Sequence, residues 1–131
     1  MTAVDTNIVV RLLTADESAQ AAAARVLFET EQIWISKTVL LETAWVLKSL
    51  YGFEEPTIRD ALTNLLGLGN VSVEDVSAVA DALTLTSKGI EFADALHLTS
   101  RPDGAAFVSF DKRFTTRATR AGVRGVRRVI L

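Results

Sequence analysis

The sequence predicts an α/β fold, with a three-layer α/β/α arrangement around a central, mostly parallel sheet of about five short strands. Short β-rich runs alternate with longer segments of helical periodicity along the whole chain. Strands that alternate with helices favour a parallel sheet covered by helices. The length of 131 residues suits one core of ordinary size, so residues 1–131 are expected to form a single domain.

The first strand and the first helix are expected to meet at an aspartate. The apolar run at the N-terminus stops at Asp5, and a second apolar run begins at residue 8. The strand should therefore end at Val4 or Asp5. The helix should begin at Thr6 or Asn7, because Thr and Asn oxygens accept hydrogen bonds from the first helical turn. Ligands of open α/β sheets bind at the carboxyl ends of strands, so Asp5 would lie in the functional crevice; the alternative is that Asp5 only caps the helix.

The remaining elements follow in alternation. Asp16 and Ser36 are expected to cap the helices that follow them, and Gly52 to end the second of these. The helix at 37–51 is apolar on most sides, which predicts a largely buried helix. The expected strands are 33–35, 70–73, 105–110 and 126–131. Helices are expected at 18–30 and 37–51, from 54–56 to the glycine at 67, from 74 or 75 to about 87, over 91–98, and from about 112 to 121 or 122. The order is β-α-α three times, then β-α and β.

Composition limits the chemistry open to the chain. The absence of cysteine excludes disulfides and thiolate metal sites, and the single histidine, His97, excludes a site of several histidines. Any bound metal must be held by oxygen, which points to a hard cation such as Mg²⁺ or Mn²⁺. No secretory signal and no membrane-spanning run is expected, so the sequence favours a cytoplasmic protein without a membrane partner.

The net charge of −2 hides an uneven distribution of charge. Residues 101–131 carry 8 Lys and Arg against 2 Asp and Glu, a balance of +6. Residues 1–100 carry 6 against 14, a balance of −8. The basic final quarter suggests a path for a polyanion, and the alternative is a solvated face of arginines.

Three further carboxylates occupy positions comparable with that of Asp5. Asp111 directly follows an expected strand, and Glu42 and Asp94 lie near the starts of expected helices. Glu42 lies in an apolar helix, so it is expected to be paired, hydrogen-bonded or metal-bound unless it faces solvent on a polar stripe. Asp94 could be a metal ligand, with His97 three residues later on the same helix face. The alternative is that Asp94 only makes the first turn of the helix acidic, which suits the helix dipole.

The topology brings these carboxylates to one place. In a parallel sheet, the ends of strands and the starts of the following helices lie at the same edge, so all four acids are expected in one crevice. Four carboxylates would repel one another strongly without compensating charge. One or two divalent cations would relieve this repulsion, and the chemistry expected of such a site is metal-assisted hydrolysis of a phosphate ester.

Four segments carry a family resemblance. They are residues 3–13 (AVDTNIVVRLL), Glu42 in its apolar helix, residues 92–97 (FADALH) and residues 107–114 (FVSFDKRF). In this order and spacing they resemble a PIN domain. More closely, they are similar to the VapC-type ribonuclease toxins of prokaryotic toxin–antitoxin systems. The resemblance extends over the whole chain in length and in the order of elements.

The resemblance implies an acidic quartet that binds Mg²⁺ or Mn²⁺ and activates water to cleave an RNA phosphodiester. Its members would be Asp5, Glu42, Asp94 and Asp111. Thr6 or Asn7 would orient Asp5 or help to hold a metal-bound water, and Ser109 would support the site. The resemblance further implies an RNA substrate, a homodimer and a small VapB-type antitoxin whose tail enters the crevice.

Two other functions compete with this one. A non-catalytic RNA- or protein-binding domain on the same fold would bind RNA whether or not metal is present. A phosphatase of the haloacid dehalogenase type also places an Asp after its first strand. That chemistry requires a second Asp two residues later, where this chain has Asn7.

Overall fold

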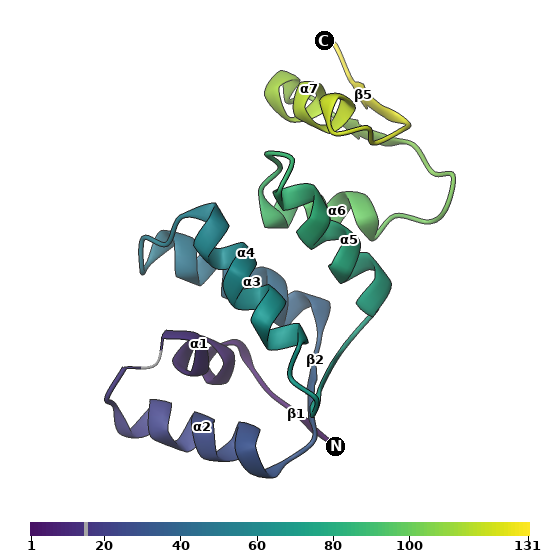
Figure 1. Cartoon of the computed structure of the whole chain (residues 1–131). Helices are drawn as coiled ribbons and strands as arrows, with labels where there is room; N and C mark the ends of the chain where they lie inside the picture. Colours follow the sequence, from purple (N-terminus) through teal and green to yellow (C-terminus); the bar gives the residue numbers. More distant parts are fainter. Residues whose placement is uncertain (15) are drawn as a thin grey trace. The chain divides into compact units, whose positions relative to one another are not determined.

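The computed structural model describes residues 1–14 and 16–131, and its elements follow the predicted order (Figure 1). Parallel strands and helices alternate along the described chain. The elements are β1 (Thr2–Ala3), α1 (Thr6–Thr14), α2 (Ala19–Thr30), β2 (Ile33–Ile35), α3 (Lys37–Ser49), α4 (Glu55–Leu66), β3 (Val71–Val73), α5 (Val76–Thr86), α6 (Phe92–Thr99), β4 (Phe107–Ser109), α7 (Lys112–Arg120) and β5 (Val126–Arg128). The prediction of an α/β chain with about five short strands is confirmed.

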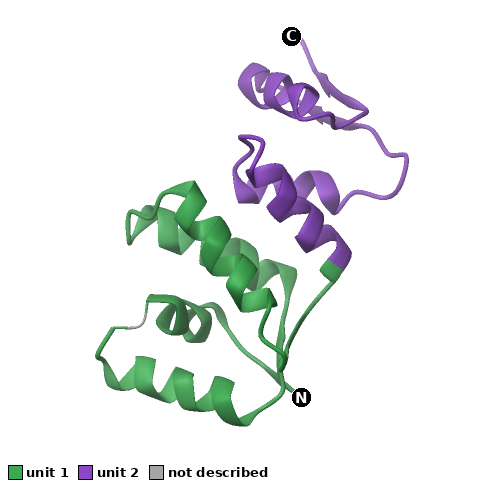
Figure 2. Cartoon of the chain, in the orientation of Figure 1, with its two compact units in different colours: residues 1–76 green, residues 77–131 purple. Residues whose placement is uncertain are grey.

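The chain divides into two compact units, residues 1–76 and residues 77–131 (Figure 2). Unit 1 contains a three-stranded sheet in the order β1-β2-β3, and unit 2 contains the pair β4-β5. Every pairing is parallel, as predicted. The expected strands are thus distributed over two hydrogen-bonded sheets, one in each unit.

The core of unit 1 forms around β2. Ile33 and Ile35 of this strand are fully buried, and the α3 side chains Leu40 and Leu47 are buried with them. A run of Ile, Trp and Ile suits a central parallel strand, because such a strand is covered on both faces. The Asn70 side-chain amide donates to the carbonyl of Glu31 at 2.8 Å and so joins the chain before β3 to the loop before β2.

Helix α3 is less buried than its composition predicts. Ser36 caps it as expected, with its hydroxyl oxygen accepting from the Val39 amide at 3.2 Å, and Gly52 follows its end with a φ of +69°. The expectation of a largely buried helix is wrong for one face, where the Trp45 side chain is 60% exposed. Only the face of α3 that carries Leu40 and Leu47 is packed inside unit 1, because a helix that covers a sheet turns one face toward that sheet.

Two boundaries also differ from the prediction. Strand β1 ends at Ala3, which leaves Val4 and Asp5 in the connection to α1. Ser18, and not Asp16, caps α2: the Ser18 hydroxyl oxygen accepts from the Ala21 amide at 3.1 Å. Asp16 instead accepts hydrogen bonds from Ser18. Ser18 lies directly before the first helical residue, which is the position a cap requires.

Unit 2 has its own small core. Phe92 and Leu98 of α6 are buried, as are Phe114 and Ala118 of α7. The rings of Phe107 in β4 and Phe114 are packed edge to face with centroids 5.6 Å apart, which joins the strand to the helix that follows it. Across the described residues of both units, no helix combines the length and apolar character needed to cross a membrane.

One buried polar group in α3 gives a stability prediction. Thr43 is fully buried, and its hydroxyl has no hydrogen-bond partner in the described part of the chain. A buried hydroxyl without a partner costs about 1–3 kcal/mol, and valine has nearly the same shape without the hydroxyl. We therefore expect Thr43→Val to raise the free energy of unfolding by about 1 kcal/mol, measured by urea denaturation.

Thr115→Val is the matched control for this substitution. Thr115 is also a buried helical threonine, but its hydroxyl donates to the Lys112 carbonyl at 3.1 Å. Its replacement should lower stability or leave it unchanged. If both variants shifted stability in the same direction by the same amount, the unsatisfied hydroxyl of Thr43 would not be the cause.

Candidate functional site

Asp5 and Glu42 line the same pocket of unit 1. Asp5 follows β1 and Glu42 lies in the second turn of α3, so residues 37 positions apart in the chain meet at one hollow. Both side chains belong to exposed residues. The rest of the lining is mainly apolar and comes from α1 and α3: Thr6, Asn7, Val10, Val39, Val46, Leu50 and Tyr51.

Asp5 both caps α1 and keeps a free oxygen. Its Oδ1 accepts from the Ile8 amide at 3.1 Å, which satisfies one of the unpaired N–H groups at the helix start. Its Oδ2 has no hydrogen-bond donor in the described part of the chain. The two readings of Asp5, helix cap and functional carboxylate, are therefore compatible with each other.

Thr6 connects the two acids of this pocket. The Thr6 hydroxyl donates a hydrogen bond to Oε1 of Glu42. Glu42 is thus both hydrogen-bonded and open to solvent, which combines two of the alternatives that its sequence position left open. Since Thr6 is the residue directly after Asp5, this hydrogen bond fixes the position of Glu42 relative to the end of β1.

Asn7 is held by a polar network on the surface of unit 1. Its side-chain nitrogen donates to Oε1 of Gln20 at 3.3 Å, and Arg11 Nε donates to the same oxygen at 3.0 Å. Arg11 also forms an ion pair with Asp16 at 2.8 Å. The network therefore joins α1 to α2, and it leaves the carbonyl oxygen of Asn7 without a donor in the described residues.

Asp94 and Asp111 line a second pocket, which lies in unit 2. Asp94 comes from the first turn of α6, and Asp111 directly precedes α7. Glu91 also lines this pocket, as its spacing from Asp94 allows. Two cations, Arg113 and Arg117 of α7, complete the polar part of the lining. His97 is exposed and does not line this pocket.

Asp111 repeats the arrangement seen at Asp5. Its Oδ1 accepts from the Phe114 amide at 3.1 Å and so caps α7. Its own amide donates to the Ser109 hydroxyl oxygen at 3.0 Å, which fixes the turn between β4 and α7. Ser109 is thus hydrogen-bonded to the backbone of an acidic residue of the candidate site.

The comparison with family models agrees with this geometry. The model described as PIN domain matches residues 2–119 and so runs through both units. The chain belongs to the PIN domain family. No curated protein matches it. Seven helices and five short parallel strands in the described residues are consistent with the three-layer α/β/α fold expected of this family. PIN domains are in general metal-dependent nucleases, so this is a nuclease fold.

The donor groups of the two pockets fit a hard divalent cation. Each pocket offers carboxylate oxygens and no nitrogen or sulfur ligand, which is the set that Mg²⁺ and Mn²⁺ prefer. Within residues 1–14 and 16–76, and within residues 77–131, no three acidic or imidazole groups are close enough together to hold a metal. A pair of carboxylates is nevertheless sufficient, since Mg²⁺ usually keeps several waters and takes one or two carboxylates from a protein.

Sequence reasoning missed two features of this PIN domain. Arg113 and Arg117 line the pocket of Asp94 and Asp111, although they had been assigned only to a general basic region. Their spacing of four residues on α7, directly after Asp111, was the available signal. Leu50 and Tyr51 line the pocket of unit 1, and no pattern in the sequence distinguishes them from core residues.

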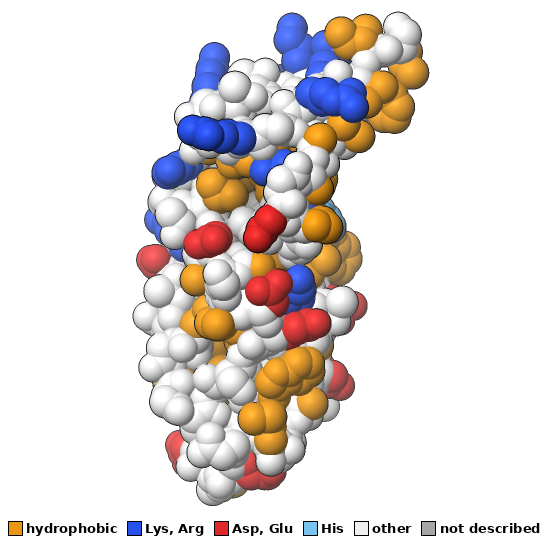
Figure 3. All heavy atoms as spheres, turned by 90° about the vertical axis from the view of Figure 1, so that its right-hand side faces the viewer, with side chains coloured by type: hydrophobic (Ala, Val, Ile, Leu, Met, Phe, Trp, Pro, Cys, Tyr) orange, Lys and Arg blue, Asp and Glu red, His pale blue; other side chains and the backbone are white. Residues whose placement is uncertain are grey.

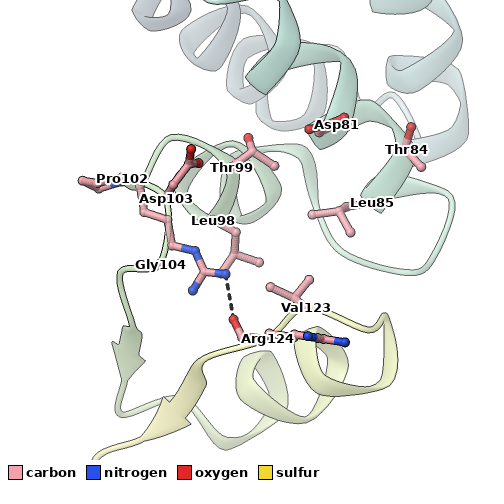
Figure 4. A pocket seen from close by; sticks show the side chains of 11 residues that line it. Asp81, Thr84, Leu85, Leu98, Thr99, Pro102, Asp103, Gly104, Val123 and Arg124 are labelled. Atoms are coloured by element: carbon pink, nitrogen blue, oxygen red, sulfur yellow. Dashed lines mark hydrogen bonds between the residues drawn. The ribbon is translucent and has the colours of Figure 1, made fainter.

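A further hollow in unit 2 contains none of the four predicted acids (Figure 4). Arg101 Nη2 donates to the Arg124 carbonyl at 2.7 Å, and Gly104 has the positive φ of +77° expected of the turn at 101–104. The other terminal nitrogen, Nη1, is buried, and a Cβ at Gly125 would lie 3.5 Å from it. Arg101 therefore joins the loop after α6 to the loop before β5 and has a structural role.

The network around Asn7 predicts a pH dependence of stability. Hydrogen bonds from the Ser18 hydroxyl and amide, together with Arg11, hold the pKa of Asp16 below its usual 3.8. Because the pKa of Asp16 is lower in the folded state than in the unfolded state, the ionised side chain stabilises the fold at pH values above 3.8. This contribution is lost as the pH falls through the folded-state pKa. Asp16→Asn should therefore lower the thermal midpoint at neutral pH, and the difference from wild type should shrink in acid. A difference that is equal at both pH values would contradict this assignment.

Proposed function

We propose that this PIN domain is a metal-dependent endoribonuclease in which the two units form one domain over residues 1–131. The observation that supports this proposal is the pairing of the acids: Asp5 with Glu42 in one pocket and Asp94 with Asp111 in another. In each pocket the aspartate that lies between a strand and a helix caps the helix through Oδ1, and its Oδ2 has no donor among the described residues. Such oxygens are suited to a cation.

In this proposal the four carboxylates hold Mg²⁺ or Mn²⁺. When bound, the metal supplies a more acidic water and polarises the phosphate oxygen. Thr6 holds Glu42 in place through its hydroxyl, and Ser109 holds the backbone of Asp111. Asn7 has a free carbonyl oxygen at the same pocket as Asp5, which would accept a hydrogen bond from a water there.

RNA is the substrate that the charge distribution supports. Residues 77–131 carry 9 Lys and Arg against 5 Asp and Glu, so unit 2 has a formal charge of +4. Arg113 and Arg117 lie beside Asp94 and Asp111, where they would neutralise phosphate oxygens close to the reacting group.

We further propose that the nuclease is the toxin of a type II toxin–antitoxin pair. The support is the resemblance of residues 3–13, 92–97 and 107–114 to VapC-type toxins. On the same ground we propose that the chain acts as a cytoplasmic homodimer and is neutralised by a VapB-type antitoxin. The exposed apolar side chains of Trp45, Leu50 and Tyr51 on unit 1 would suit a protein partner.

Removal of a single carboxylate should abolish cleavage. Asp5→Asn and Asp94→Asn each keep the size of the side chain but remove a charged metal ligand. We expect each variant to lose at least about 100-fold in cleavage of total RNA in the presence of Mn²⁺ or Mg²⁺. Their stability should remain near that of wild type, because each change relieves repulsion between acids and asparagine at position 5 can still cap α1.

Glu29→Gln and Asp81→Asn are the controls for these variants. Both remove an exposed helical carboxylate, one from each unit, that lies outside the two pockets. They should cleave RNA like wild type. Wild-type rates in Asp5→Asn and Asp94→Asn would refute the proposed site, and cleavage that persists in EDTA would refute the role of metal. RNA binding without cleavage would favour the alternative of a non-catalytic binding domain.

The proposed role as a toxin makes a separate prediction. Induced expression of the wild-type chain in bacteria should arrest growth, whereas Asp94→Ala should not, because it lacks a carboxylate needed for cleavage. The measurement is colony formation after induction, with protein levels compared by immunoblot. Equal growth of both strains at equal expression would contradict the role as a toxin but not the nuclease activity in vitro.

A further inference from the structure

Helix α7 exposes a row of arginines along its whole length. Arg113, Arg117 and Arg120 follow one another at intervals of four and three residues, which places them on one face of the helix. The opposite face carries Phe114 and Ala118, which are buried. Figure 3 shows Lys and Arg side chains gathered over the end of unit 2 that α7 and β5 form.

A groove continues this row between α7 and β5. Arg120 lines it from the helix, and Arg127 and Arg128 line it from the strand. The lining includes three threonines and no acidic residue; we call it the α7–β5 groove, and its members are Thr115, Thr116, Thr119, Arg120, Val126, Arg127 and Arg128. Guanidinium groups beside hydroxyl groups are the donors that phosphate oxygens accept.

The arginines of the α7–β5 groove have no carboxylate beside them in its lining. In unit 1, by contrast, Arg11, Lys37 and Lys48 each have a carboxylate oxygen within 4 Å. Like charges four residues apart on a helix destabilise it, so the row of arginines is a cost to the fold. Such a cost is consistent with a surface selected for an external polyanion.

The groove is linked by hydrogen bonds to the segment after β4, which contains Asp111. Arg128 pairs in register with Ser109, and its Nε donates to the carbonyl of Phe110 at 3.3 Å. Phe110 directly precedes Asp111, whose amide is bonded to Ser109. The row on α7 begins at Arg113 in the pocket of Asp94 and Asp111 and ends at Arg120 in the groove. A backbone of regularly spaced phosphates matches a row of regularly spaced cations.

We propose that the α7–β5 groove binds the phosphate backbone of single-stranded RNA on one side of the cleaved bond, with Arg117 between the groove and the acidic pair. The proposal rests on the proposed nuclease function and assigns substrate-binding residues to it. The hydroxyls of Thr115 and Thr119 already donate to backbone carbonyls, so the guanidinium groups are the main donors of the groove. Because the groove offers these donors and no aromatic side chain, it recognises phosphates and is indifferent to base sequence.

Salt dependence of RNA binding tests this proposal without any need for cleavage. Binding of a short fluorescein-labelled oligouridylate to the full chain would be measured by anisotropy in EDTA, over a range of about 50–200 mM salt. Each phosphate contact to single-stranded nucleic acid contributes about 0.7 to the slope of log K against log salt. Arg120→Gln should reduce the slope by about 0.7, and Arg120→Gln with Arg127→Gln by about 1.4.

Arg25→Gln is the matched control for these variants. Arg25 is an exposed helical arginine of α2 in unit 1, and its replacement changes the net charge by the same amount as Arg120→Gln. It should leave the slope unchanged. A slope for Arg120→Gln that equals those of wild type and Arg25→Gln would overturn the groove proposal, even if the protein cleaves RNA normally.

Two further outcomes separate this proposal from its alternatives. If wild type neither binds nor cleaves RNA, both the proposed function and the groove proposal fail. If an acidic peptide binds the groove with this arginine dependence and RNA does not, the surface serves a protein partner and the RNA proposal is wrong. Loss of cleavage in Asp94→Asn with an unchanged slope is the result expected when the acids and the groove have separate roles.

Discussion

The candidate site depends on one local junction, a strand that runs through an aspartate into a helix. At Asp5 and again at Asp111, one carboxylate oxygen accepts an amide hydrogen of the first helical turn. The unpaired N–H groups and the dipole of a helix start stabilise a negative charge at this place. One oxygen of each aspartate thus caps a helix, and the second oxygen has no donor among the described residues. In the proposed function the same side chain would serve both the fold and the site.

The second acid of each pocket is provided by a different part of the same unit. Glu42 reaches the end of β1 through the Thr6 hydroxyl, and Asp94 lies in the first turn of α6 beside Asp111. Within each unit, one acid directly precedes a helix and the other lies in the first or second turn of another helix. The proposal of a nuclease rests on the family match across both units, because an α/β fold by itself does not identify a reaction.

The order of elements was predictable from sequence because it follows from local signals. Buried strands such as Ile33–Ile35 are short β-branched runs, and Ser36 and Gly52 mark helix ends by their own backbone preferences. The contact between Thr6 and Glu42 was not predictable, because it joins residues 36 positions apart and leaves no periodic pattern. The exposed face of α3 at Trp45 was missed for a related reason: composition shows that a helix is apolar but not how many of its sides are covered.

The two pockets differ in how their negative charge is balanced, and this difference bears on the proposed reaction. Arg113 and Arg117 lie beside Asp94 and Asp111, whereas no Lys or Arg lines the described pocket of Asp5 and Glu42. In that apolar hollow the pair is compensated mainly by helix-start amides and a hydroxyl. A divalent cation would therefore gain most from Asp5 and Glu42, while the arginines of α7 are better placed to neutralise phosphate. In the proposed nuclease the acids would hold the metal and the basic helix would hold the RNA backbone.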